Sequence, residues 1–162
     1  RPTRQARMDT VGVLLFVGLG IIAILGKRWA YIAFVSLSLL AIPARTGFRL
    51  QWPSCETVLT AQNIALSLTK YAHVVLFGIF FIMTVAQVRG SLGSRFAWAA
   101  VATLVFGAVI ELEQGATRTG NCRARDLFPD ALGALLGVVV VMLWNLIRGA
   151  GRRRSAALSP ES

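Results

Sequence analysis

The chain has 162 residues, of which 56% are hydrophobic and 15% are charged, and its mean hydropathy is +0.65. The apolar residues come in blocks instead of alternating with polar ones, which argues against a soluble globular domain. The balance of 17 Lys and Arg against 7 Asp and Glu raises the question of nucleic acid. The basic residues, however, form short clusters between the apolar blocks, as topology signals do. We therefore expect membrane lipids, and no nucleic acid, as partners.

Five apolar segments predict an all-α fold, an integral membrane bundle of about five transmembrane helices in a single domain over residues 1–148. Helices of roughly 17–25 residues cross the hydrocarbon, and open strands are excluded because lipid cannot satisfy their backbone groups. Residues 10–44 taken as one helix would be about 50 Å long. Two crossings with a turn at Lys27-Arg28 fit better. The expected spans are 10–26, 29–44, 71–88, 96–114 and 127–147.

The connections differ in length and character. The longest runs from Arg45 to Lys70, and a short helix over 57–69 is expected within it. A short polar loop covers 115–125. The tail over 149–162 is basic and rich in small residues, so we expect it to be disordered. The sequence begins at Arg1 and not at Met, which is compatible with a start further upstream.

The basic residues also predict the orientation. Arg148 and the run 152–154 favour a cytoplasmic C-terminus, and alternation then places the loops over 45–70 and 115–125 outside. Five spans place the N-terminus outside as well, although three of its first seven residues are arginines. With these included, eight basic residues lie inside and nine outside, which together are the 17 of the chain. The orientation of the N-terminus therefore stays open.

The two cysteines, Cys55 and Cys122, lie in loops that share a face under strict alternation. A disulfide between them would require an oxidising compartment such as the periplasm. Two free thiols in unrelated positions are the alternative. The chain has one histidine and no CxxC or HExxH spacing, so we expect no metal and no cofactor.

The acidic residues gather on the expected outer face. Lys70 and His73 open the third span, where the helix dipole disfavours positive charge, and Glu111 lies near the end of the fourth, where it disfavours negative charge. These placements require partners of opposite sign. The expected arrangement pairs Glu111 with Lys70 or with an arginine of the 115–125 loop. The acids on this face are Glu56, Glu111, Glu113, Asp126 and Asp130.

Helical spacing then predicts a polar pocket among three helix ends. Asp126 and Asp130 share a face at i, i+4, and Glu111 and Gln114 share one at i, i+3. Ionisable residues within a membrane are functional candidates, and the alternative is a purely structural cluster of salt bridges. The expected pocket residues are Lys70, His73, Glu111, Gln114, Arg118, Arg123, Arg125, Asp126 and Asp130.

Three motifs in this region resemble those of the VanZ-like family of small bacterial membrane proteins. Lys70-Tyr71-Ala72-His73 matches K-x-x-H, which opens one span, and Glu111-Leu112-Glu113-Gln114 matches E-x-x-Q, which closes the next. The third motif, D-x-x-x-N-x-x-G-x-x-x-G, is matched in spacing by Asp126, Asp130, Gly133 and Gly137. Gly133 and Gly137 also form a GxxxG pattern, which predicts close helix packing. The resemblance covers about residues 29–148.

The chain departs from the family pattern at several points. Asp130 replaces the usual Asn, Phe77 stands where Tyr is common, and a span precedes the usual four. A longer loop leaves Arg118, Arg123 and Arg125 competing for the family arginine. The family takes its name from an accessory protein of glycopeptide resistance associated with teicoplanin. The resemblance thus implies a role in the bacterial cell envelope, at the cytoplasmic membrane, with a link to glycopeptide resistance.

Three functions compete. A non-enzymatic protein would bind an anionic lipid, a lipid-linked cell-wall precursor or a glycopeptide, with Lys70 and the loop arginines holding an anionic headgroup. A membrane enzyme would act on a lipid headgroup with His73 and Glu111 as an acid/base pair. A small transporter would need polar groups at the bilayer midplane and preferably an inverted repeat, which the sequence does not show. The ligand and the oligomeric state stay open.

Overall fold

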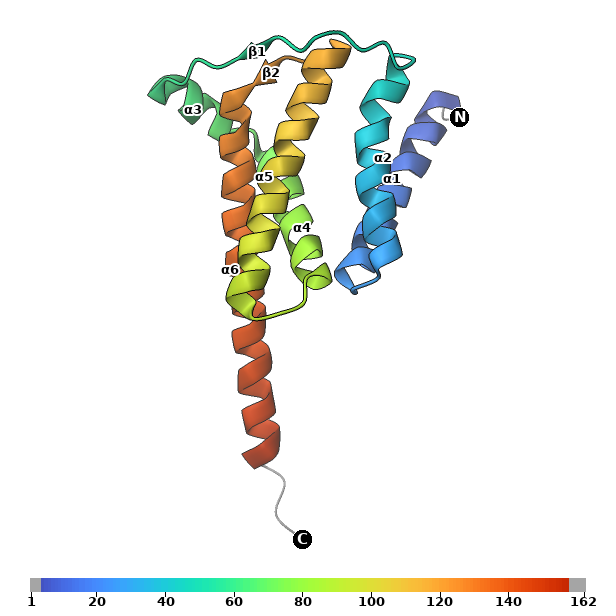
Figure 1. Cartoon of the computed structure of the whole chain (residues 1–162). Coiled ribbons are helices and arrows are strands. Elements are labelled where there is room, and N and C mark those ends of the chain that lie inside the picture. The colour runs from blue at the N-terminus through green and yellow to red at the C-terminus, as the bar shows by residue number, and fades with distance from the viewer. Residues whose placement is uncertain (1–3, 158–162) are drawn as a thin grey trace.

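The protein consists of helices joined by short connections and one pair of two-residue strands (Figure 1). A computed structural model describes residues 4–157, including their side chains except those of residues 4–10, 42, 45 and 151–157. The elements are α1 (Arg4–Ile24), α2 (Arg28–Arg45), β1 (Cys55–Glu56), α3 (Ala61–Leu68), α4 (Tyr71–Gln87), α5 (Leu92–Thr117), β2 (Cys122–Arg123), the 3-10 turn η1 (Ala124–Asp126) and α6 (Leu127–Ala157).

Two helical segments have the length and composition to cross a membrane, as a membrane protein requires. They are Leu92–Thr117, which is α5, and Ala124–Ala150, which covers η1 and most of α6. A third is counted if α3 and α4, which meet at a bend of 70°, are taken as one span. α1 and α2 contain shorter apolar stretches, over Val11–Ile24 and Arg28–Ala41. The helical expectation is therefore confirmed, and five crossings stay a prediction.

Two expectations about the connections can be compared with the structure. The short helix expected over 57–69 is α3, which begins after Thr60 because the Thr60 hydroxyl accepts the Asn63 N–H at 3.2 Å and caps the first turn. The disorder expected from residue 149 is wrong for 149–157, which continue α6. An existing helix extends easily through Arg and Ala, two strong helix formers. The remainder of that expectation, 158–162, lies outside the described residues.

Helices α4 and α6 form the most extensive contact between two elements of the described chain. A Cβ atom on Gly133 would lie 2.5 Å from the Val74 carbonyl oxygen, and one on Gly137 would lie 2.6 Å from the Phe81 ring. Both positions therefore need glycine, and the GxxxG pattern lets the two backbones approach closely. A buried apolar cluster joins α5 to these two helices, through Phe81 of α4, Ala99 of α5 and Ala134 of α6.

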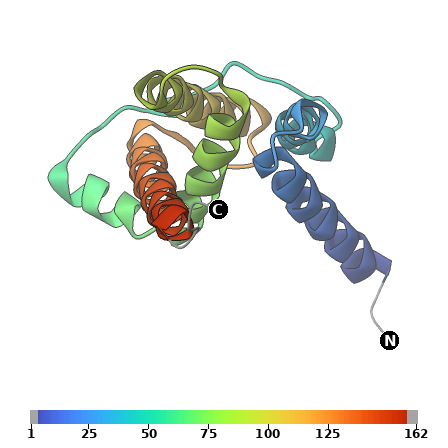
Figure 2. The ribbon, with the colours of Figure 1, turned by 90° about the horizontal axis from the view of Figure 1, so that it is seen from below.

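The α1–α2 hairpin stands beside this group, on the opposite side from α3 (Figure 2). It turns at Gly26, whose φ is 84°, and it is attached to α4 near that turn. The Tyr31 hydroxyl hydrogen-bonds the Thr84 hydroxyl at 3.0 Å, and the Gln87 side-chain amide donates to the Ala23 carbonyl at 2.7 Å. A buried cluster at the same level joins the hairpin to α4 through Leu19, Ala23, Ala30, Phe80 and Met83.

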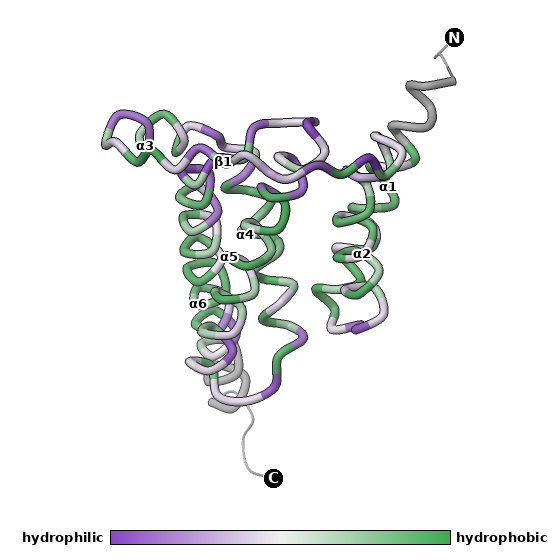
Figure 3. The backbone as a smooth tube through the Cα atoms, turned by 45° about the horizontal axis from the view of Figure 1, so that its top comes forward, coloured by the Kyte–Doolittle hydropathy of each residue, from purple (hydrophilic) through white to green (hydrophobic). Residues whose placement is uncertain are grey.

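Hydropathy separates the helices from the two ends of the molecule. The tube is hydrophobic along the helices and hydrophilic in the connections (Figure 3). The stretch from residue 46 to α3 and the α5–β2 connection lie at one end, and the α1–α2 and α4–α5 turns lie at the other (Figure 1). The buried acids Glu111, Asp126 and Asp130 lie at the end that carries β1 and β2.

Candidate functional site

Two loops are fastened together at this end of the molecule. β1 pairs with β2 in parallel, with Cys55 opposite Cys122, and these two cysteines form a disulfide with a Cα–Cα distance of 4.5 Å. The Gln51 N–H also donates to the Ala116 carbonyl at 2.8 Å. The sequence left open whether these cysteines form a disulfide or stay free thiols, and in the structure they are joined. The fastening holds the long α2–α3 connection over the end of α5.

Asp126 is the acceptor at the centre of the network. It ends the turn η1 and is 3% exposed. One of its carboxylate oxygens accepts the Ser67 hydroxyl from α3, and the other accepts the Lys70 ammonium, which precedes α4. One carboxylate thus connects α3, the start of α4 and the start of α6. Each oxygen of this buried carboxylate therefore has one donor.

Glu111 has a different partner from the one expected. Its side chain, buried near the end of α5, accepts the backbone N–H of Arg123 at 2.9 Å. The expected ion pair with the Lys70 ammonium or with an arginine guanidinium is therefore wrong, because Lys70 is bound to Asp126. The loop arrives over α5 with its β2 backbone facing inward, so the peptide group reaches the carboxylate. Glu111 holds the loop in place.

His73 is oriented by Asp130 and not by Glu111. The His73 Nδ1 lies 3.0 Å from Asp130 Oδ1, and Asp130 is 1% exposed. The expected orientation of His73 by Glu111 is therefore wrong, because the carboxylate beside His73 is that of Asp130. Since Nδ1 faces this carboxylate, Nε2 is the ring nitrogen left for any other partner. The imidazole also stacks on Phe77, with ring centroids 5.9 Å apart.

Small residues admit the Asp130 side chain to this position. A Cβ atom on Gly107 of α5 would collide with Asp130 Oδ2, and Gly133, one turn after Asp130, lets α6 lie against α4. Asp130 Oδ2 has no hydrogen-bond partner among the described residues. A buried carboxylate oxygen without a donor is costly. The pair with His73 therefore has to carry most of the stabilisation of this carboxylate.

The loop arginines are compensated by an acid that sequence reasoning left outside the pocket. Arg125 lies 3.1 Å from Glu56 Oε1, and the Arg123 Nε lies 3.4 Å from Glu56 Oε2. The strand pairing explains this arrangement because it sets Glu56 opposite Arg123. Glu56 is about as exposed as Arg123, so these pairs contribute less than those of the buried acids.

Arg118 differs from Lys70, Arg123 and Arg125, which pair with carboxylates. It follows α5 with a φ of 54° and is exposed, and it makes no ion pair or side-chain hydrogen bond with the described residues. It lines a cavity of about 530 Å³ at the end of α5, which we call the polar cavity. The residues around this cavity are Trp52, Ser54, Cys55, Glu56, Gly115, Arg118, Gly120, Asn121 and Cys122.

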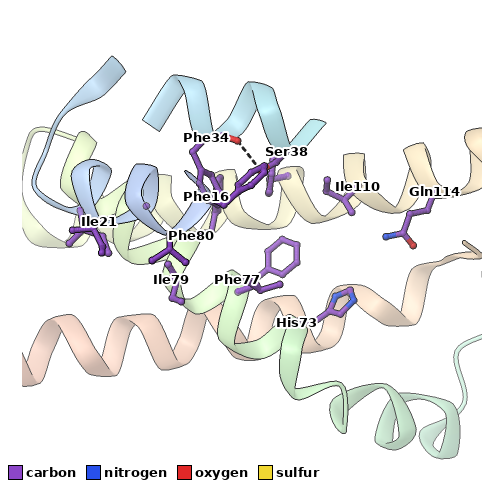
Figure 4. A pocket seen from close by; sticks show the side chains of 15 residues that line it. Phe16, Ile21, Phe34, Ser38, His73, Phe77, Ile79, Phe80, Ile110 and Gln114 are labelled. Carbon is purple, nitrogen blue, oxygen red and sulfur yellow. Dashed lines mark hydrogen bonds between the residues drawn. The ribbon is translucent and has the colours of Figure 1, made fainter. Parts of the chain in front are cut away.

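A second cavity of about 550 Å³ lies between the α1–α2 hairpin and α4 and α5, and we call it the apolar groove (Figure 4). Phenylalanine rings from all four helices line it. His73 of α4 and Gln114 of α5 both lie towards one end, and Ile21 lies at the other (Figure 4). Gln114 is thus a groove residue, and its neighbour Gly115 belongs to the polar cavity. Both cavities are thus lined by residues from the last turns of α5.

Most expected pocket residues come together, in three groups. Asp126 binds Lys70, Asp130 binds His73, and Glu111 binds the β2 backbone. Arg118 and Gln114 lie apart from these pairs and line the cavities instead. Sequence reasoning missed Ser67 as a partner, although its position three residues before Lys70 was a usable signal. It also left out Glu56, whose place beside Cys55 becomes informative once the disulfide is known.

The charges of the cluster nearly cancel. Four acids, Glu56, Glu111, Asp126 and Asp130, face the cations of Lys70, Arg123 and Arg125 and the imidazole of His73. Such mutual pairing favours a structural role for most of them, which leaves the Arg118 guanidinium and His73 Nε2 for a ligand. No group of three or more metal-ligating side chains lies in the part of the chain that the structure describes.

Comparisons of this chain with protein-family models, with curated proteins and with solved structures give no match. The resemblance to the VanZ-like family therefore depends on its three motifs. In the structure these motifs supply both sides of the Lys70–Asp126 and His73–Asp130 pairs.

Proposed function

We propose that this chain is a VanZ-like membrane protein of the bacterial cell envelope that binds an anionic amphiphile, with its headgroup in the polar cavity. The observation that carries the proposal is Arg118, an arginine without an acidic partner among the described residues, at the rim of a cavity at the membrane end of α5. Arginine forms charge-assisted, bidentate hydrogen bonds to phosphate. Lipids and lipid-linked precursors both carry phosphate in their headgroups.

The remaining cations of the expected pocket have another role in this proposal. Lys70, Arg123 and Arg125 are each occupied by a carboxylate. A headgroup would have to displace those carboxylates, at a cost that grows with their burial. These residues therefore shape and fasten the cavity, and Asn121 and Trp52 at its rim supply further contacts to the headgroup.

The test removes one positive charge at a time from the same membrane face. Arg118→Asn suits the left-handed backbone at this position, and Arg49→Asn is the matched control, since Arg49 is exposed but does not line the polar cavity. Native mass spectrometry should find dioleoyl phosphatidylglycerol retained in preference to dioleoyl phosphatidylcholine. We expect Arg118→Asn to remove that preference and Arg49→Asn to keep it. An unchanged preference in Arg118→Asn contradicts the proposal.

The second candidate is a membrane enzyme acting on a lipid headgroup. The 3.0 Å contact between His73 and Asp130 favours it, because a histidine oriented by a buried carboxylate can serve as a general base or acid through Nε2. The described residues show no serine or cysteine nucleophile hydrogen-bonded to this histidine. A water or a substrate hydroxyl would therefore be the group that His73 activates.

This candidate has its own test. The purified protein would be incubated in vesicles of phosphatidylglycerol and of a lipid-linked sugar diphosphate, and the released headgroup would be measured by mass spectrometry. Release that falls at least a hundredfold in His73→Gln and in Asp130→Asn, but not in Glu56→Gln, supports an enzyme. Release equal to that of empty vesicles removes this candidate.

A further inference from the structure

The apolar groove lies between the hairpin turn at one end and polar side chains at the other. The hairpin is attached to α4 near its turn, through the Tyr31–Thr84 and Gln87–Ala23 hydrogen bonds and the buried cluster around Phe80. Towards the end that carries the polar cluster, Phe16 and Phe34 of the hairpin line one side of the groove. A cavity that extends from the hairpin turn and is lined by four helices suits an elongated apolar ligand.

The length of the groove matches one leaflet. Its lining extends along α4 from His73 to Phe80 and along α5 from Phe106 to Gln114, which at 1.5 Å per residue are about 10 and 12 Å. The hydrocarbon core of a bilayer is about 30 Å thick, so each leaflet contributes about 15 Å. The groove therefore spans most of one leaflet, starting from the level of the polar cluster. A polyprenyl chain would be far longer than this groove.

The polar end of the groove is chemically distinct from the rest. His73 Nε2 and the Gln114 side-chain amide offer a donor and an acceptor at the point where the apolar lining stops. The ester and glycerol oxygens of a glycerolipid lie at the corresponding depth, between the acyl chains and the headgroup. Along the same helix, Gly115 and Arg118 follow Gln114 and line the polar cavity. Apolar lining, hydrogen-bonding groups and a cation thus follow one another in the order found along a glycerolipid.

We infer that the apolar groove holds one acyl chain of a glycerolipid from the adjoining leaflet, with its ester region at His73 and Gln114. This inference rests on the proposed function because it supplies the tail of the same amphiphile whose headgroup Arg118 would bind. It narrows the ligand class from lipids and lipid-linked precursors to glycerolipids. The cavity volume of about 550 Å³ lies in the range of small-ligand sites.

The experiment fills the groove without changing His73, Gln114 or Arg118. Leu76 lines the groove, and its neighbour Val75 does not, yet both are largely exposed on α4, at 62% and 58%. Leu76→Trp should obstruct the groove, and Val75→Trp is its matched control. Ser38→Phe with Ser36→Phe is a second pair on α2, where only Ser38 lines the groove. Each variant would be checked by circular dichroism before lipid binding is measured.

The measurement compares two lipids with the same headgroup. In native mass spectrometry we expect dioleoyl phosphatidylglycerol to bind the unmodified protein at least tenfold more tightly than dihexanoyl phosphatidylglycerol. Leu76→Trp and Ser38→Phe should remove this chain-length preference, and the two controls should keep it. Groove variants that behave as their controls overturn the inference. A dimer that is lost in both groove variants also overturns it, because the groove would then hold a second copy of the chain.

The design separates the two proposals. A chain-length effect that is lost in the groove variants, without any preference for phosphatidylglycerol over phosphatidylcholine, supports the groove and contradicts the headgroup site. A headgroup preference that survives in all four variants, without a chain-length effect, supports the headgroup site and overturns the groove. Equal loss in groove and control variants also overturns the groove, because it reports on the lipid-facing surface in general.

Discussion

The α3–α6 region and the α1–α2 hairpin are held in different ways. α4 and α6 touch backbone to backbone at Gly133, and buried carboxylates join the ends of the helices. The hairpin meets α4 through one cluster of side chains and two hydrogen bonds near its turn. Gly12 and Gly18 of α1 have no neighbouring atom within 4 Å of an added Cβ. One region is fixed by close packing, whereas the other meets α4 mainly near its turn and has further contacts between α2 and α5.

This difference assigns different tasks to the two regions. Without a hydrophobic driving force between helices, association in lipid depends on close packing and hydrogen bonds. The α3–α6 region has both and can hold ionisable groups at fixed positions. The hairpin has fewer such contacts, so its separation from α4 at the groove can adapt to a guest. The proposed lipid would lie between a rigid wall and an adjustable one.

The largest effect is expected at the closest helix contact. Gly133→Leu would place a branched side chain against the Val74 carbonyl and the Gly78 amide, which lie 2.5 and 2.9 Å from the Cβ position. We expect a loss of about 3 kcal/mol or more in the free energy of unfolding. Unfolding of the purified protein in increasing dodecyl sulfate, followed by circular dichroism, measures it. Gly18→Leu in the hairpin should change this value little, and equal losses at both sites would remove the contrast between the regions.

A smaller loss is expected when the central carboxylate is removed. Asp126→Ala leaves the buried Ser67 hydroxyl and the Lys70 ammonium without their acceptor. We expect a cost of about 2 kcal/mol, because the buried hydroxyl stays unpaired while Lys70, about a third exposed, can be hydrated. The same unfolding assay measures it. Glu56→Gln serves as the control, with an expected cost below about 1 kcal/mol for an exposed pair. A larger loss in Glu56→Gln would contradict the assignment of Asp126 as the central residue.

The sequence was sufficient for features that depend on one segment at a time. The apolar blocks located α2 and α4 and the start of α6 to within one residue, because an apolar run marks the helix that contains it, whereas α1 begins six residues before its block and α6 ends ten residues after its own. Placement of Cys55 and Cys122 on one face followed from alternation. The GxxxG spacing of Gly133 and Gly137 located the closest helix contact, since small residues four apart form one stripe on a helix.

The choice of partners could not be predicted, because it depends on how segments cross. The 70° bend between α3 and α4 turns Ser67 and Lys70 together towards Asp126, and no local pattern reports that angle. Similarly, His73 pairs with Asp130 because Gly107 leaves room for this carboxylate on α5. The continuation of α6 through 149–157 was missed because a basic composition was taken as disorder, whereas Arg and Ala extend a helix.

The disulfide connects the rigid region to the loop over the polar cavity. Its two cysteines are 67 residues apart, and chain entropy for such a loop corresponds to about 4 kcal/mol. We expect the double variant, Cys55→Ser with Cys122→Ser, to lose about 2 kcal/mol in the free energy of unfolding. The loss is smaller than the chain-entropy value because helices that stay in the membrane shorten the effective loop. Dodecyl sulfate unfolding with and without reductant measures it. Reductant should not affect the double variant. A double variant as stable as the oxidised protein would show that the strand pairing and Glu111 suffice to hold the loop.

The smallest effect is expected where the hairpin meets α4. Tyr31→Phe removes the hydrogen bond to Thr84 while keeping the ring beside Phe80, with centroids 5.9 Å apart. Side-chain hydrogen bonds between membrane helices contribute about 0.6 kcal/mol on average, so backbone amides of α2 should exchange with deuterium about threefold faster. Tyr71→Phe, at an exposed tyrosine without a side-chain hydrogen bond to the described residues, should leave the exchange unchanged. A tenfold increase confined to α2 would mean that this bond holds the hairpin almost alone. An increase that extends through α4 and α6 would mean that the two regions open together, so the hairpin would not be an independent wall of the groove.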